Sequence, residues 1–167
     1  MTQSRQFLIK FAVLLVVLYA IVALHPVNDH VIVPYTKMLT WIVAKALTLI
    51  HITAVASGTV INAARFAMDV HNGCNGIEAV VLLLAAIAAF PASLSDRAKG
   101  LLFGLLFVQV VNIIRLVMLF WLGAYHRSVF DLFHVTVWQT IIVLITFAFF
   151  YVWSTRVASR TTSAPAR

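Results

Sequence analysis

Cys74 is the single cysteine of this 167-residue sequence, and an Asn-Gly pair stands on each side of it. It lies where a polar stretch is followed by an apolar run. A thiol beside a helix N-terminus experiences the positive end of the helix dipole, which favours the nucleophilic thiolate. We expect Asn75 to cap a helix that begins at Ile77, with Glu78 three residues after the cap as in a capping box. The position indicates a nucleophile, although a lone cysteine can also be a small buried apolar residue.

Two more side chains could join this thiol. Arg115 lies inside an apolar run, so its guanidinium must face a helix bundle or a wet cavity rather than lipid. Gln109 and Asn112 precede it at three-residue steps and share its helix face. His134 opens the next apolar run. A thiol, an imidazole and a guanidinium can perform acyl transfer, in which the thiol attacks, the imidazole moves protons and the guanidinium stabilises the oxyanion.

Two other uses of these residues stay open. Arg115 could snorkel to the interface, or pair with Glu78 and so lock two helices together. A metal site is the second, because His71 and Cys74 have an H-x-x-C spacing. The remaining spacing is irregular for a ligand set, so we expect no metal and no cofactor. The other histidines that could face the same side are His25, His30, His126 and His134.

The composition indicates an integral membrane protein. Hydrophobic residues make up 63% of the chain, charged residues only 10%, and the mean hydropathy is +1.02. Several continuous apolar runs approach the length of a membrane-spanning helix, and they are too long for barrel strands. The net charge of +7 lies mostly at the ends of these runs, as topology signals do, so we expect a lipid bilayer and no nucleic acid as partner.

We therefore predict an all-α integral membrane fold in a single membrane domain over residues 1–167. The outer segment, 25–76, is expected to hold an interfacial amphipathic helix over 34–57 and a short extracytoplasmic hairpin over 58–70. A fifth span over 34–57 is the alternative, and it would reverse the topology that follows. Polar loops are expected over 93–100 and 123–131, and a disordered tail over 154–167. The four predicted spans are residues 7–24, 77–91, 101–122 and 132–153.

The prediction of an amphipathic helix depends on one polar face, and the predicted orientation in the membrane depends on the positions of the basic residues. Lys37, Trp41, Lys45, Thr48 and His51 recur at helical spacing along one face of the predicted helix. With four spans, the positive-inside rule directs both chain ends to the cytoplasm and Cys74 to the outer face. The basic residues that this orientation places on the outer side, against the rule, are Lys37, Lys45, Arg65 and Arg127.

At this point the chain resembles the exosortase/archaeosortase family of multispanning membrane cysteine enzymes. The resemblance rests on Cys-Asn-Gly-Ile at 74–77, on Asn-Ile-Ile-Arg at 112–115, and on His134 at the head of a span. Many members have Ser where this chain has Asn75, and most have additional spans before the catalytic part. The compact form is most similar to exosortase H, which is paired with proteins bearing an IPTLxxWG-type C-terminal signal.

The resemblance implies a cysteine protease or transpeptidase of the bacterial cytoplasmic (inner) membrane, with its active site on the extracytoplasmic side. Its substrates would be secreted proteins with a C-terminal tail made of a motif, a transmembrane helix and a basic cluster. It would transfer them to an acceptor that the sequence does not identify. Carried over to this chain, Cys74 is the nucleophile, Arg115 the oxyanion or substrate-positioning residue and His134 the general acid/base. Asn112 is a support, and Glu78 and Asn75 flank the nucleophile.

Two rival functions use the same features. A small non-enzymatic transporter or assembly factor would explain the polar stripe around Arg115 but would give Cys74 no role. A membrane thiol acyltransferase or hydrolase acting on lipid would use the same residues on another substrate. The sequence contains neither a G-x-S-x-G elbow nor a Gly-rich phosphate loop.

Overall fold

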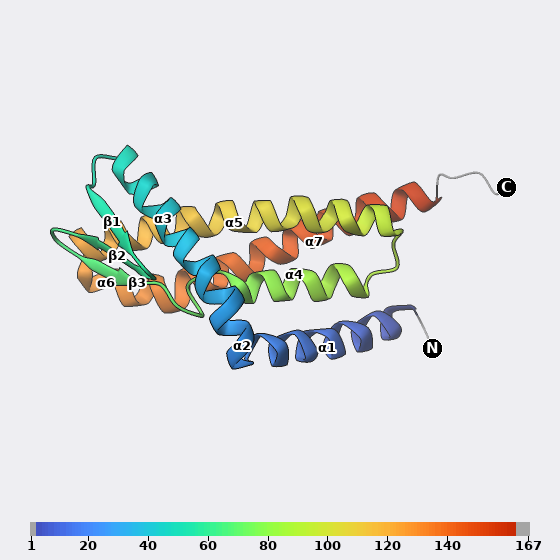
Figure 1. The fold of residues 1–167 in the computed structure, drawn as a ribbon. Coiled ribbons are helices and arrows are strands. Elements are labelled where there is room, and N and C mark those ends of the chain that lie inside the picture. Colours follow the sequence, from blue (N-terminus) through green and yellow to red (C-terminus); the bar gives the residue numbers. More distant parts are fainter. Residues whose placement is uncertain (1–2, 163–167) are drawn as a thin grey trace.

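The computed structural model describes residues 3–162, in which a helix bundle carries a small sheet and a further helix, α3, at one end. The chain runs back and forth along the bundle, so the start of α1 and the end of α7 lie at the same end (Figure 1). The small sheet and α3 lie at the opposite end, where the chain passes from α1 to α4. The bundle helices are α1 (Gln3–Val22), α4 (Ile77–Ala89), α5 (Leu94–Tyr125) and α7 (Trp138–Thr162).

The described residues contain three helical segments long and apolar enough to cross a membrane: Ser4–Val22, Leu94–Tyr125 and Arg127–Arg160. These segments agree with the prediction of a mostly helical, multi-pass membrane protein. The fourth predicted span corresponds to α4, which is apolar but has only 13 residues. The count of four spans therefore stays a prediction. Helix α4 ends at Ala89 because the residue before Pro91 is driven into extended backbone, and Phe90 has ψ 137°.

Helices α4, α5 and α7 approach closely at Gly104. A Cβ atom at this position would lie 2.7 Å from a Leu83 methyl carbon and 2.7 Å from the Phe149 ring. A larger residue at Gly104 would therefore force the Leu83 and Phe149 side chains to move. Helix α1 packs along α4, and its Phe7 ring contacts the rings of Phe90 and Phe150 near the end that bears the termini.

Helix α3 (Val33–Leu49) is amphipathic, as predicted. Leu39, Val43 and Leu47 are buried in the core beneath the sheet, whereas Lys37 and Lys45 lie on the exposed face. The predicted extent of the helix is wrong, because α3 ends at Leu49 rather than at residue 57. The chain reaches α3 from α1 through α2 (His25–Val27) and a π-helical turn, η1 (Asn28–Ile32).

An antiparallel sheet follows α3, in the order β1 (Ala54–Ser57), β2 (Val60–Ala63) and β3 (Ala67–Asp69). The predicted hairpin corresponds to β2 and β3, which pair Ile61 with Met68. Strand β1 was not predicted, because its apolar residues continue the helical pattern of α3 without a break in composition. Gly58, with φ 63°, makes the turn between β1 and β2.

Two predicted loops and part of the predicted tail are helical. Helix α5 begins at Leu94, because the Ser93 side chain caps it by accepting a hydrogen bond from the Asp96 amide. The predicted loop over 123–131 holds the end of α5 and all of α6 (Arg127–Asp131), which continues through η2 (Leu132–Val137) into α7. Helix α7 continues to Thr162, so the prediction of disorder is wrong for 154–162. Residues 163–167 lie outside the described part of the chain.

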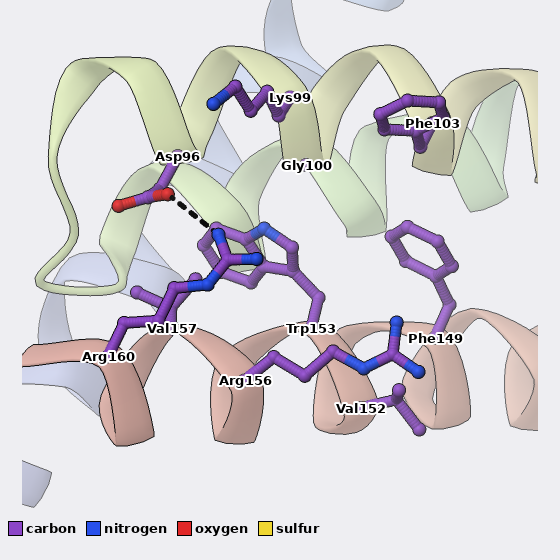
Figure 2. Close-up of a pocket in the computed structure, with 10 residues that line it drawn as sticks. All are labelled: Asp96, Lys99, Gly100, Phe103, Phe149, Val152, Trp153, Arg156, Val157 and Arg160. Carbon is purple, nitrogen blue, oxygen red and sulfur yellow. Dashed lines mark ion pairs between the residues drawn. The ribbon is translucent and has the colours of Figure 1, made fainter. Parts of the chain in front are cut away.

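Basic side chains gather at the end that bears the termini. There α5 and α7 line a cavity of about 270 Å³, and an ion pair of 3.6 Å joins Arg160 to Asp96 across it (Figure 2). Lys99 of α5 and Arg156 of α7 also line this cavity. This end is therefore strongly positive, and it lies a full bundle length from the sheet (Figure 1).

Candidate functional site

Cys74 and His134, which lie 60 residues apart in sequence, meet at the end of the bundle that bears the sheet. The Cys74 Sγ lies 2.7 Å from the His134 Nε2. Cys74 is buried at 6% exposure, and His134 is half-buried on η2 with its ring stacked on Phe130 at a centroid distance of 5.4 Å. Both line a cavity of about 200 Å³ whose other walls come from β3, α5 and the α6 region. A thiol and an imidazole in contact beside a cavity can perform nucleophilic catalysis.

The loop that carries Cys74 is held by hydrogen bonds from α3. The buried side-chain amide of Asn75 donates through Nδ2 to Thr36 Oγ1 at 3.1 Å and to Asn72 Oδ1 at 3.0 Å. The Tyr35 hydroxyl lies 3.1 Å from the Asn75 carbonyl oxygen and also bonds Gln109 Oε1. Burial raises the pKa of Tyr35, so its hydroxyl stays protonated and able to donate. Helix α3 thus fixes the backbone beside the thiol.

The predicted capping box is wrong in its register. The N-cap of α4 is Gly76, which adopts a left-handed conformation with φ 81° and has no side chain that could cap the helix. Asn75 Oδ1 instead accepts from the Ile77 amide at 3.2 Å. Glu78 Oε1 accepts a hydrogen bond from the Gly73 backbone amide at 2.7 Å. This bond ties the first turn of α4 to the residue before Cys74. The glycine sets this register because its φ lies where other residues are strained.

The Arg115 guanidinium contacts the same loop. Arg115 is 1% exposed, and its Nη2 donates to the Gly73 carbonyl at 3.1 Å and lies 3.5 Å from Gln139 Oε1. Within residues 3–162 no ion pair joins Arg115 to Glu78, so the alternative of a helix-locking pair is not what the structure contains. The guanidinium instead contacts the backbone of Gly73, the residue that precedes Cys74 in the loop.

Asn112, one turn before Arg115, packs against the loop without bonding it. A Cβ atom at Gly76 would lie 2.8 Å from Asn112 Nδ2, so the loop passes over this amide with no room for a side chain. Asn112 is fully buried, and in the described part of the chain neither its Nδ2 nor its Oδ1 has a hydrogen-bond partner. The expectation that Asn112 lies beside the site is therefore met in position, while its role stays a prediction.

Burial raises the pKa of the Cys74 thiol above its usual range. The positive charge of Arg115 acts in the opposite direction, and the carboxylates of Glu78 and Asp69 add to the rise. This differs from the expectation that the helix dipole would favour thiolate. The thiol at rest is protonated, and its proton needs an acceptor before the sulfur can attack.

Three contributors were not predicted as site residues: Tyr35, Thr36 and Gln139. Gln139 had a signal, because it is a polar residue inside an apolar run, five positions after His134. Thr36 and Tyr35 had none, since their contacts with the loop depend on how α3 packs. His71, which was considered with Cys74 as a pair of metal ligands, lies in the same loop. Its Nδ1 lies 2.7 Å from the Asn72 carbonyl oxygen.

Comparison with known protein families gives a match over most of the chain. The model of a family described as transmembrane exosortase, of the EpsH type, matches residues 3–152. This range includes every residue placed at the site above. No curated protein and no solved structure matches the chain.

Proposed function

Because the chain belongs to the transmembrane exosortase family, we propose that it is a membrane cysteine protease or transpeptidase acting on C-terminal sorting signals of secreted proteins. This family of membrane proteins is associated with protease or transpeptidase processing of sorting signals. The observation that carries the proposal for this chain is the contact of 2.7 Å between Cys74 Sγ and His134 Nε2. The assignment to exosortase H, and with it the IPTLxxWG-type signal, stays part of the proposal.

In the proposed reaction, His134 Nε2 takes the proton from the Cys74 thiol, and the thiolate attacks the carbonyl carbon of the scissile peptide bond. The tetrahedral intermediate collapses when His134 returns the proton to the departing amine. This step leaves a thioester between Cys74 and the new carboxyl end of the substrate. Water or the amine of an acceptor then attacks the thioester, and the thiol is regenerated. The high pKa of the thiol supports a base-assisted attack, because little thiolate is present beforehand.

Arg115 is proposed to act on the oxyanion and to position the substrate. Its guanidinium holds the Gly73 carbonyl, so its charge lies next to the residue that bears the nucleophile. A fixed cation in a water-poor site stabilises charge that develops nearby during the reaction. Asn112 supports this arrangement from one helical turn away, and Asn75 and Glu78 fix the loop.

We further propose that the protein lies in the bacterial inner membrane, with the sheet end outside. The cluster of Arg97, Lys99, Arg156 and Arg160 at the other end supports this orientation through the positive-inside rule. A substrate whose own helix ends at the outer surface would then present its cleavage site at the depth of Cys74. The acceptor is not identified by any residue of the site.

A processing assay tests the proposal. The chain is co-expressed with a secreted reporter that carries an IPTLxxWG-type tail, and wild type is compared with Cys74→Ala and Cys74→Ser. We expect loss of the tail with wild type alone, at equal levels of the three proteins in the membrane. Arg156→Lys, at the far end of the bundle, is the matched control and should process as wild type does. Processing by Cys74→Ala at the wild-type rate would remove the thiol from the mechanism.

A further inference from the structure

A second cavity lies on the other side of the nucleophile loop, within the helix bundle. It has a volume of about 230 Å³ and opens between α1, α4 and α7. Its lining shares no residue with the cavity that holds Cys74 and His134. The loop 73–76 belongs to both, because Cys74 faces one cavity and Gly76 lines the other. Of its lining residues, the reaction described above uses only Arg115 and Glu78, and it places no part of the substrate in this cavity.

The second cavity is apolar along most of its length and polar at one end. Leu15 of α1, Leu82 of α4 and Val143 and Phe147 of α7 give it walls that suit hydrocarbon or apolar side chains. Its polar end carries Glu78, Arg115 and Gln139. A cavity of this kind, with a few polar groups at a fixed place on apolar walls, is typical of a binding site.

The polar end contains a buried group whose bonding is incomplete. Arg115 is 1% exposed, and within the described residues its Nε has no hydrogen-bond partner. Buried polar groups in folded proteins are nearly always paired, so an unpaired guanidinium nitrogen beside a cavity calls for a ligand that accepts a hydrogen bond.

The same end also offers an acceptor, because Glu78, whose Oε1 accepts from the Gly73 amide, lines the cavity together with Arg115. A phosphate would meet the charge of Glu78, and a cation would meet that of Arg115. A polypeptide backbone suits both, since each residue presents one N–H donor and one C=O acceptor without net charge. Within a membrane such groups must be satisfied when a chain leaves the helical conformation.

We propose that this cavity receives the substrate polypeptide at the outer end of its membrane helix, where the backbone unwinds. Arg115 and Gln139 donate hydrogen bonds to backbone carbonyls, and Glu78 accepts from a backbone N–H. The apolar walls hold the side chains of the segment, and the chain then passes the glycines at 73 and 76 to reach Cys74. Gly76 lines the cavity, and open space lies beside Gly73, where a Cβ atom would meet nothing within 4 Å. This inference rests on the proposed function, because it names where that substrate docks.

Cross-linking tests this docking without requiring cleavage. In the Cys74→Ala background, single cysteines are introduced at Leu82 and Val143, which line the cavity. The control is Ile114→Cys in the same background, because Ile114 is 55% exposed and lies beside Arg115 on α5, at matched depth. Each is co-expressed with the tailed reporter carrying one cysteine in the first turn of its membrane helix. Isolated membranes are then treated with a short bismaleimide.

We expect Leu82→Cys and Val143→Cys to cross-link the reporter about tenfold more than Ile114→Cys does, because docking raises the local concentration of the reporter. Equal yields at all three positions would overturn the inference. It would also be overturned if a photoactivatable phospholipid labelled the cavity positions and excess reporter did not compete, since the occupant would then be lipid. Cleavage of the reporter by wild type without cavity cross-links would reject the docking site alone. Cavity cross-links without cleavage would reject the proposed protease and keep the docking site.

Discussion

At the scale of single residues, the site is a buried thiol in contact with an imidazole. A thiol that depended on the helix dipole would be ionised at neutral pH, whereas burial keeps Cys74 protonated. The work of forming the thiolate therefore falls on His134, whose Nε2 is the nearest described acceptor for the proton. Reactivity should then be low toward a reagent that meets the thiol at random and high toward a substrate that is docked.

The first prediction concerns the pH dependence of alkylation. Because the pKa of Cys74 is raised, the thiolate fraction is smaller than that of a free thiol at every pH below this pKa. Alkylation by a small uncharged maleimide should still be rising above pH ~8.5, where an ordinary thiol is half ionised. The control is Val55→Cys in the Cys74→Ala background, since Val55 is exposed on β1. A rate for Cys74 that levels off at a lower pH than the control would contradict the raised pKa.

The second prediction concerns the shape of the Arg115 side chain. Arg115→Lys keeps the charge but loses the planar guanidinium, whose Nη2 contacts both Gly73 O and Gln139 Oε1. We expect processing to fall by about 10²-fold, the effect of removing one fixed donor from an oxyanion site. The reporter assay measures it, with Arg156→Lys as the charge-conserving control at the opposite end. Processing by Arg115→Lys equal to that of the control would exclude a role for the guanidinium geometry.

At the scale of elements, the nucleophile loop is fixed between α3 and α5. Thr36 bonds it from α3, and Gly76 lies against Asn112 of α5. The loop then enters α4 through the left-handed conformation at Gly76, the N-cap residue of the helix. The thiol is thus placed by backbone geometry, and a change that moves the backbone at Gly76 should move the thiol as well.

The third prediction concerns the stability of alanine variants at Gly76 and Gly58. It separates the cost of strained backbone from the cost of overpacking at Gly76. Gly76→Ala combines a φ of 81° with a Cβ atom 2.8 Å from Asn112 Nδ2, whereas Gly58→Ala has a φ of 63° and nothing within 4 Å. We expect Gly58→Ala to lower the free energy of unfolding by about 1 kcal/mol, the cost of strained backbone alone. Gly76→Ala should cost about 1–3 kcal/mol more, through overpacking.

Thermal unfolding in detergent compares the two alanine variants. The further change Asn112→Ala in Gly76→Ala should recover part of the difference, because it removes the atoms that the new Cβ meets. Equal destabilisation by Gly58→Ala and Gly76→Ala would show that the contact with Asn112 carries no cost.

At the scale of the whole molecule, Cys74 and His134 meet at the end of the bundle that bears the sheet, and a basic cluster that includes Lys99, Arg156 and Arg160 lies at the other end (Figures 1 and 2). The ion pair between Asp96 and Arg160 joins α5 and α7 at the basic end. The unusual residue types made Cys74, Arg115 and His134 predictable, because a thiol, a guanidinium and an imidazole stand out in apolar runs. The structure brings Cys74 into contact with His134, and it places Arg115 against the carbonyl of Gly73.

Other features could not be read from the sequence, for physical reasons. Strand β1 has the same apolar composition as the helix before it, so only its pairing with β2 identifies it. Ser93 and Asp96 form a cap whose spacing was visible, yet the polar stretch that contains them was interpreted as a loop. Tyr35 reaches Asn75 across 40 residues of sequence, and such a contact depends on packing alone.

The fourth prediction concerns the orientation of the bundle in the membrane. With the sheet end outside, a cysteine at Val55 should react in intact cells with a maleimide that cannot cross the membrane. A cysteine at Lys99, exposed at the basic end, should react only after the cells are opened. Both are made in the Cys74→Ala background. Labelling of the Lys99 position alone in intact cells would invert the orientation and place the site in the cytoplasm.

The thioester at Cys74 is the central claim, and trapping it with hydroxylamine is the most direct measurement. Wild-type membranes process the reporter in rising concentrations of hydroxylamine, and mass spectrometry identifies the new C-terminus. A thioester predicts a C-terminal hydroxamate whose share rises with hydroxylamine and which is absent with Cys74→Ala. A product that keeps a free carboxylate at every hydroxylamine concentration, formed at the same rate with Cys74→Ala, would contradict the covalent mechanism.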